Sequence, residues 1–127
     1  MKLWISERWK YFEPYEVLSP GGLAALARGV FLLDPEALDC LCSLREKLGP
    51  IKVNHSHLKL RGYRTPSENE AIGGAPLSVH MQGKAFDVTV DAFNSKQVAE
   101  AARVCGFTFT KIISDTSCHI DIRWRGE

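Results

Sequence analysis

The sequence lacks three features that would each indicate a particular class of protein: a long apolar run, an excess of charge of one sign, and a Cys-x-x-Cys pair. Its apolar runs, such as residues 29–33, are far shorter than the roughly 20 residues of a membrane-spanning helix. The 16 basic and 15 acidic residues give a formal net charge of +1, which argues against a dominant nucleic-acid surface or an acidic tail. We therefore expect neither a nucleic-acid partner nor a membrane partner.

Cysteine and histidine are scarce, with four residues of each in the chain. Cys40, Cys42, Cys105 and Cys118 form no Cys-x-x-Cys pair, and we interpret them as small core side chains in a reducing compartment. Cys118 precedes His119, so a cysteine hydrolase is one hypothesis, although strand alternation places Cys118 on an apolar face.

The beginning of the sequence offers no apolar segment of the kind found in secretory signals, because Glu7, Arg8 and Lys10 interrupt it. We therefore expect the protein to be cytoplasmic at synthesis. A length of 127 residues, with 45% of them hydrophobic, predicts one domain over residues 1–127 with its own core. We expect this domain to be a monomer.

Helical and strand patterns are mixed along the chain, which predicts an α+β fold with a small antiparallel sheet and flanking helices. The clearest helix follows Asp34-Pro35 and ends at Gly49. The capping-box pattern Thr65-Pro66-Ser67-Glu68 predicts a short helix to about Ile72, and a loop then leads to His80. Further helices are predicted over residues 14–18, 22–27 and 94–105, and strands over residues 51–54, 85–90, 108–113 and 118–124.

Three metal-ligating side chains lie on or beside the polar faces of two predicted strands. His80 and Asp87 flank Gly83, which lets the chain turn between them, and His119 lies on the polar face of the last strand. Two imidazoles and one carboxylate suit a catalytic zinc ion that keeps a fourth position for water. The spacing alone is not a metal code, so hydrogen-bonded or surface histidines are the alternative interpretation.

A longer pattern includes these residues. Ser-x-His-x-x-Gly-x-Ala-x-Asp over residues 78–87, followed by His119-x-Asp121, resembles the zinc D-alanyl-D-alanine carboxypeptidase family. That family includes phage L-alanyl-D-glutamate endopeptidases and shares its fold with hedgehog signalling domains. The run Gly62-Tyr63-Arg64-Thr65-Pro66, with Asn69 and residues 73–75, matches the upstream part of the pattern. The resemblance covers residues 11–123 and implies a hedgehog/DD-peptidase-like fold.

The resemblance implies a role for each matching residue. His80, Asp87 and His119 would bind zinc. Arg64 would orient the substrate and stabilise the oxyanion that forms on attack, which makes it both a catalytic and a substrate-binding residue. The alternative for Arg64 is a surface ion pair with Glu68 or Glu70. Ser78 would hydrogen-bond the substrate or hold its loop.

The general base is the position at which this sequence departs from the family pattern. Family members often carry a carboxylate three residues before the last zinc histidine, and that position is Thr116 here. If residues 115–123 are extended, Asp115 shares a face with His119, and we predict it as the catalytic base, with a loop carboxylate as the alternative interpretation. Asp121, on the same face, is expected to be a hydrogen-bond partner of a ligand or of Arg64.

Other polar residues near the predicted cleft carry less information. His55-x-His57 could ligate a metal as a strand pair, but it lies outside the family motif, and we interpret both as polar residues beside the cleft or on the surface. Several basic residues near the cleft would suit an anionic peptide carboxylate. These are Lys59, Arg61, Arg64 and Lys84.

The predicted function is that of a zinc metallopeptidase that cleaves peptidoglycan stem peptides with metal-activated water. Either a D-Ala-D-Ala carboxypeptidase or an L-Ala-D-Glu endopeptidase fits. Such a protein would reach the cell wall by phage-type lysis or as part of a virion. The alternative is a metal- or peptide-binding module of the same fold without turnover, which the missing carboxylate at Thr116 motivates.

Overall fold

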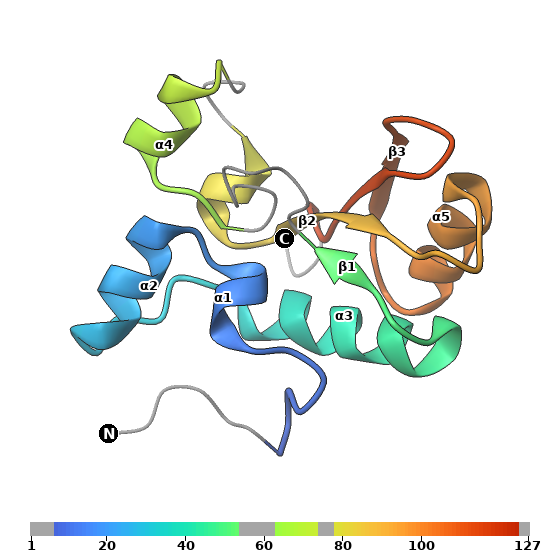
Figure 1. The fold of residues 1–127 in the computed structure, drawn as a ribbon, viewed down its shortest axis with the longest axis horizontal. Helices are drawn as coiled ribbons and strands as arrows, with labels where there is room; N and C mark the ends of the chain where they lie inside the picture. The colour runs from blue at the N-terminus through green and yellow to red at the C-terminus, as the bar shows by residue number, and fades with distance from the viewer. Residues whose placement is uncertain (1–6, 54–62, 74–77, 125–127) are drawn as a thin grey trace.

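The protein is described by a computed structural model over residues 7–53, 63–73 and 78–124, and it has a four-stranded antiparallel sheet packed with helices (Figure 1). The strands are β1 (Lys52–Val53), β2 (Ala85–Thr89), β3 (Phe109–Ile112) and β4 (Cys118–Asp121). Their order across the sheet is β1-β2-β4-β3, so β3 is an outer strand. This architecture confirms the predicted α+β class.

Two helices begin at capping residues that the sequence predicts. The Asp34 side chain caps one helix, which ends at Gly49, and Thr65 and Glu68 form the capping box of another. None of the described helices is long and apolar enough to cross a membrane. The helices are α1 (Pro14–Val17), α2 (Pro20–Ala27), α3 (Pro35–Leu48), α4 (Pro66–Ala71), the 3-10 helix η1 (Val79–Gln82) and α5 (Ser95–Val104).

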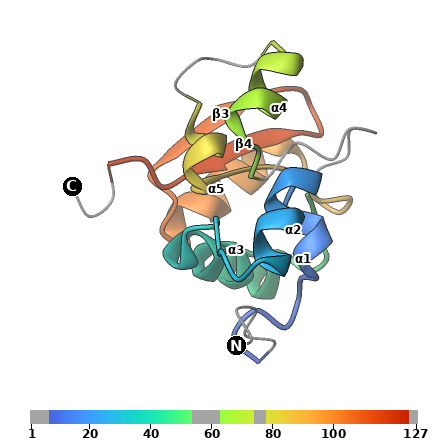
Figure 2. The same ribbon diagram turned by 90° about the vertical axis from the view of Figure 1, so that its left-hand side faces the viewer.

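The core lies on one face of the sheet. Helix α5 packs on β3, β4 and α3, while α4 lies at the opposite end of the molecule from α3 (Figures 1 and 2). Phe86 of β2 and Cys118 and Ile120 of β4 are fully buried on the core face. Because successive side chains of a strand point to opposite faces, Asp87 and His119 must point away from this core.

Strand register aligns the polar residues of the second face. Asp87 of β2 lies directly opposite His119 of β4, and His119 in turn lies opposite Lys111 of β3. Directly opposed residues in an antiparallel pair have Cβ atoms about 4.5–5.5 Å apart. The sheet therefore carries a row of one carboxylate, one imidazole and one ammonium group on its exposed side.

The predicted loop before β2 contains the one-turn helix η1, which the sequence pattern did not indicate. Gly83 ends η1 with φ +69°, and a Cβ added there would lie 2.8 Å from Leu33 Cα. The Gly83 carbonyl accepts a 2.9 Å hydrogen bond from the Asp34 N–H. The close approach of residue 83 to Leu33 requires glycine. The hydrogen bond to Asp34 holds the turn that carries His80 against the segment that enters α3.

Strand β4 is shorter than predicted. It ends at Asp121 rather than at Trp124, and Trp124 has φ +70°. Its side chain is 61% exposed instead of lying on the apolar face. The predicted apolar face of this segment is therefore observed from Cys118 to Ile122, which are buried, but not at Trp124.

Candidate metal centre

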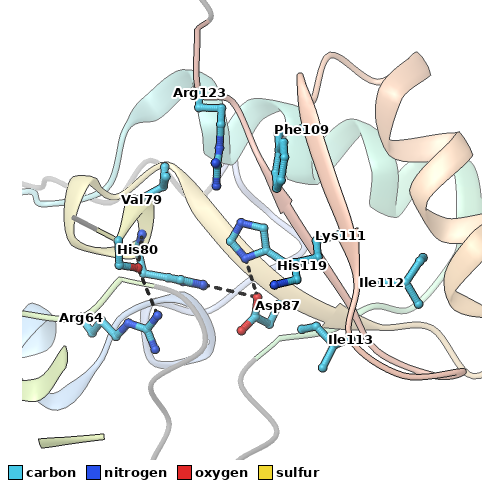
Figure 3. A pocket seen from close by; sticks show the side chains of 11 residues that line it. Arg64, Val79, His80, Asp87, Phe109, Lys111, Ile112, Ile113, His119 and Arg123 are labelled. Carbon is cyan, nitrogen blue, oxygen red and sulfur yellow. Dashed lines mark hydrogen bonds and ion pairs between the residues drawn. The ribbon is translucent and has the colours of Figure 1, made fainter. Parts of the chain in front are cut away.

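The side chains of His80, Asp87 and His119 converge on the exposed face of the sheet (Figure 3). They come from η1, β2 and β4. His80 Nε2 lies 3.3 Å from Asp87 Oδ1, and His119 Nδ1 lies 2.9 Å from the same oxygen. One potential ligand atom from each residue lies within 4.8 Å of the other two.

These distances fit the ligands of one metal ion. Zinc bonds of about 2.0–2.2 Å in tetrahedral geometry keep ligand atoms roughly 3.3–3.6 Å apart. Two imidazole nitrogens and one carboxylate oxygen are also a donor set of catalytic zinc sites with three protein ligands. The cluster can therefore hold a metal ion with small adjustments of its side chains.

Asp121 contacts the ring nitrogen of His119 that does not face Asp87. Its side chain is fully buried, and its Oδ2 lies 2.7 Å from His119 Nε2. When Nε2 carries the proton and donates a hydrogen bond to Asp121, the lone pair of Nδ1 faces Asp87, as a metal ligand requires. The expected contact of Asp121 with a ligand is present. The cationic partner of Asp121 is Arg123 rather than Arg64. Arg123 donates hydrogen bonds to the Asp121 carboxylate from Nε and Nη2.

The electrostatics of the cluster favour a bound cation. Burial alone would raise the pKa of Asp87, but hydrogen bonds from His119 and His80 outweigh it and hold that pKa well below its usual range. Burial lowers the pKa of His119, whereas Asp121 and Asp87 raise it, and the net direction is upward. Asp87 therefore stays ionised at neutral pH, and a metal ion would compete with a proton for His119.

Arg64 and Ser78 form the neighbouring wall of the site. Arg64 Nη2 donates a 3.1 Å hydrogen bond to Ser78 Oγ, which also accepts the His80 backbone N–H at 3.2 Å. Ser78 thus connects the guanidinium group to the turn that carries His80. Glu68, considered as a surface partner of Arg64, instead accepts hydrogen bonds from Ser19 and from the Thr65 backbone.

An open cavity of about 650 Å³ surrounds the cluster. Arg64 and Ser78 line it on one side, and Phe109, Lys111 and the residues after them line it from β3. The sequence interpretation missed this β3 wall. The signal for it was the alternation within residues 108–113, which places Phe109 and Lys111 on one face, but nothing in the sequence paired that strand with β4.

The structure does not show the extended chain on which the prediction for Asp115 rests. Asp115 lies in the bend between β3 and β4, its side chain is exposed, and it is not among the cavity-lining residues of the described segments. The prediction assumed an extended chain from residue 115 onward, but β4 begins only at Cys118. Among the described residues that line the cavity, Asp87 is the only carboxylate.

Cys118 is part of the core, as strand alternation predicted. It is fully buried, and burial raises the pKa of its thiol to about 11. A thiol in this state is a poor nucleophile, so the structure does not support the cysteine hydrolase hypothesis. All four cysteines are free thiols.

Several candidates from the sequence lie outside the described residues. These are His55, His57, Lys59, Arg61, Gly62 and residues 74–75. Lys84 is described, but it does not line the cavity.

Comparison with known protein families matches residues 18–121 to Peptidase M15. A comparison with curated proteins finds no match. The matched range covers most of the chain and contains Arg64, Ser78 and the three residues of the candidate metal centre. It agrees with the resemblance that the motifs indicate. The chain therefore belongs to the peptidase M15 family.

Proposed function

We propose that this protein is a zinc-dependent peptidase that cleaves peptidoglycan stem peptides, at either the D-Ala-D-Ala or the L-Ala-D-Glu bond. The observation that carries the proposal is the convergence of His80, Asp87 and His119 in an open cavity beside Arg64. Membership of the M15 family supports a peptide substrate.

Each residue of the site has a chemical task in this proposal. His80, Asp87 and His119 would hold the zinc ion, and Asp121 keeps the Nδ1 atom of His119 available by accepting a hydrogen bond from the Nε2–H group. A bound zinc ion would supply Lewis-acid polarisation of the scissile carbonyl and would lower the pKa of water.

Arg64 is suited to stabilising the negative charge that develops on the carbonyl oxygen. Its guanidinium group carries several N–H donors in a fixed plane, and the hydrogen bond to Ser78 orients it beside the cluster. Donors positioned in advance are worth more in a partly dehydrated cavity than in water. Loss of Arg64 should therefore lower kcat more than it weakens substrate binding.

A second candidate function follows from the position of Asp115. Among the described residues, no carboxylate other than Asp87 lines the cavity. The described lining therefore contains no second carboxylate that could accept a proton from water. A metal-dependent peptide-binding module without turnover is consistent with this arrangement.

The deciding experiment is digestion of purified peptidoglycan with zinc-loaded protein, followed by mass spectrometry of the muropeptides. The proposed peptidase releases products that identify the bond, and His119→Ala abolishes them together with bound zinc. Asp91→Asn is the matched control, since it removes an exposed carboxylate that is not among the cavity-lining residues. Absence of products from protein shown to contain zinc would favour the binding module.

A further inference from the structure

Among the described residues, three cationic side chains line the cavity, and two of them have partners within it or beside it. Arg123 donates hydrogen bonds to Asp121 from Nε and Nη2 and stacks on Phe109, with its Cζ atom 3.8 Å from the ring centroid. Arg64 donates to Ser78 on the wall formed with η1. The third cation is Lys111 of β3.

Lys111 occupies the opposite side of the cluster from Arg64 (Figure 3). It pairs directly with His119 across β3 and β4, so the two side chains share a face of the sheet. Its side chain is exposed at the rim of the cavity. In the described part of the chain, no carboxylate forms an ion pair with Lys111.

The charges of the lining residues leave a positive excess. Asp121 is matched by Arg123, and Asp87 faces the two histidines. Arg64 and Lys111 lie on two separate walls of the cavity, and a bound divalent metal would add to the positive charge there. A concave site with this charge attracts anions, and a carboxylate is the anion that an unmodified peptide carries.

The neighbours of Lys111 suit an extended peptide. Ile112 and Ile113 continue the same wall, and each side chain is 49% exposed. An aliphatic surface beside an ammonium group can receive the carbon chain of an acidic residue while the carboxylate contacts the lysine.

From this arrangement we propose that Lys111 binds a substrate carboxylate separate from the group that Arg64 contacts, and that the site therefore prefers peptides with an acidic group near the scissile bond. The inference rests on the proposed peptidase function for its substrate class. Lys111 would be a specificity residue and not part of the reacting centre.

The test uses two pairs of synthetic stem peptides that differ in one functional group. In one pair the D-Glu residue carries a free carboxylate or a carboxamide, and in the other pair the C-terminus does. For wild-type protein we expect kcat/KM to favour the acid by about five- to ten-fold in at least one pair. Lys111→Met should reduce this ratio to about one, while Lys111→Arg should keep most of it.

Lys96→Met is the matched control, because Lys96 is an exposed lysine of α5 that does not line the cavity. It should leave the acid-to-amide ratio as in wild type. Zinc content should be equal in all variants, which excludes an indirect effect through the metal. A wild-type ratio of one in both pairs, or an unchanged ratio in Lys111→Met, would overturn the role of Lys111.

Failure of the peptidase function can be recognised separately. If no peptide is cleaved, the affinities of zinc-loaded protein for the same acid and amide peptides are measured by isothermal titration. An acid preference that disappears in Lys111→Met would support the carboxylate site in a protein without turnover. Equal affinities for acid and amide would reject it.

Discussion

The His119 ring is held from two sides, by Asp87 at Nδ1 and by Asp121 at Nε2. Only one of these contacts has to be exchanged when a metal binds. The Asp121 contact can persist, and it determines which nitrogen is free to coordinate. The buried Asp121 carboxylate, which Arg123 fixes in place, therefore orients a metal ligand without contacting the metal itself.

We predict that Asp121→Asn weakens zinc binding by about 10- to 100-fold, because the amide no longer fixes the His119 tautomer with a charged acceptor. Competition with a chromogenic chelator measures the affinity. Asp91→Asn, which alters an exposed carboxylate paired with Lys52, serves as the control and should bind zinc as wild type does. Equal affinities of the two variants would contradict the positioning role.

Asp115 provides a second prediction at the residue scale. Because its side chain lies in an exposed bend outside the cavity lining, Asp115→Asn should keep peptidase activity within about two-fold of wild type. The measurement is kcat/KM on the stem peptide that the wild type cleaves. A loss of a hundred-fold or more would show that the bend moves Asp115 to the reacting water.

Sequence patterns identified site residues best where metal-ligating residue types occur at the spacing of a family motif. The candidate ligands could be identified from the sequence because His80, Asp87 and His119 occupy fixed positions in a family motif. Lys111 could not be identified, since its place opposite His119 depends on strand pairing, which the local sequence does not determine. The extended conformation assumed for Asp115 is not observed, because parity along a strand says nothing about where the strand begins.

At the scale of elements, Glu68 joins the starts of two helices. Its carboxylate accepts hydrogen bonds from the Ser19 hydroxyl at 2.6 Å, the Gly21 N–H at 3.1 Å and the Thr65 N–H at 2.8 Å. Ser19 is itself the N-cap of α2, and Thr65 is the N-cap of α4. One side chain therefore satisfies donors that belong to both helix termini.

We expect Glu68→Gln to lower the free energy of unfolding by about 1–2 kcal/mol at pH 7. Burial would raise the pKa of Glu68, but these hydrogen bonds outweigh it and lower that pKa below its ordinary value of 4.5. The ionised form is thus favoured in the folded protein, so its stabilisation is present above pH 4.5 and is lost as the pH falls through the lowered pKa.

Urea unfolding at pH 7 and at about pH 3 tests this dependence. The difference between wild type and Glu68→Gln should shrink at the lower pH. Glu70→Gln is the matched control, because Glu70 is an exposed residue of the same helix. A difference that does not change with pH would mean that the carboxylate charge is not the stabilising feature.

Gly83 permits a prediction about the turn between η1 and β2. Gly83→Ala combines an unfavourable positive φ with a Cβ that would lie 2.8 Å from Leu33 Cα, and we expect destabilisation of about 3 kcal/mol or more. Gly29→Ala is the control, since Gly29 has φ +87° but nothing within 4 Å of an added Cβ. Its cost should be about 1 kcal/mol.

Chemical denaturation measures both variants, and zinc affinity adds a second readout for Gly83→Ala. Because the turn carries His80, its displacement should weaken zinc binding as well as folding. Equal destabilisation of the two variants would indicate that φ alone, and not the contact with the chain before α3, makes glycine necessary.

For the whole molecule, the sequence predicted the class of the fold and the approximate position of most elements. Capping residues and apolar periodicity are local, so they identified α3, α4 and α5 well. The order β1-β2-β4-β3 is a property of long-range pairing, and no local pattern encodes it. The cavity depends on that order, because it brings β3 beside the strand that carries His119.

Metal removal should affect the entire fold. Zinc that binds only the folded state stabilises it by about 2.7 kcal/mol when the free metal is at 100 times its dissociation constant. We therefore expect a higher Tm for zinc-loaded protein than for protein treated with chelator, and no such difference for His80→Ala. An identical Tm with and without zinc, despite stoichiometric binding, would contradict this linkage.

The pairing of β2 with β4 also makes metal content a measure of tertiary structure. Asp87 and His119 are 32 positions apart in the chain and meet only when the two strands are in register. His80 and Asp87, by contrast, remain neighbours in an unfolded chain. A fluctuation that separates β2 from β4 would remove one donor from the proposed zinc site, so the rate at which a chelator takes up zinc from loaded protein would report how often the sheet opens.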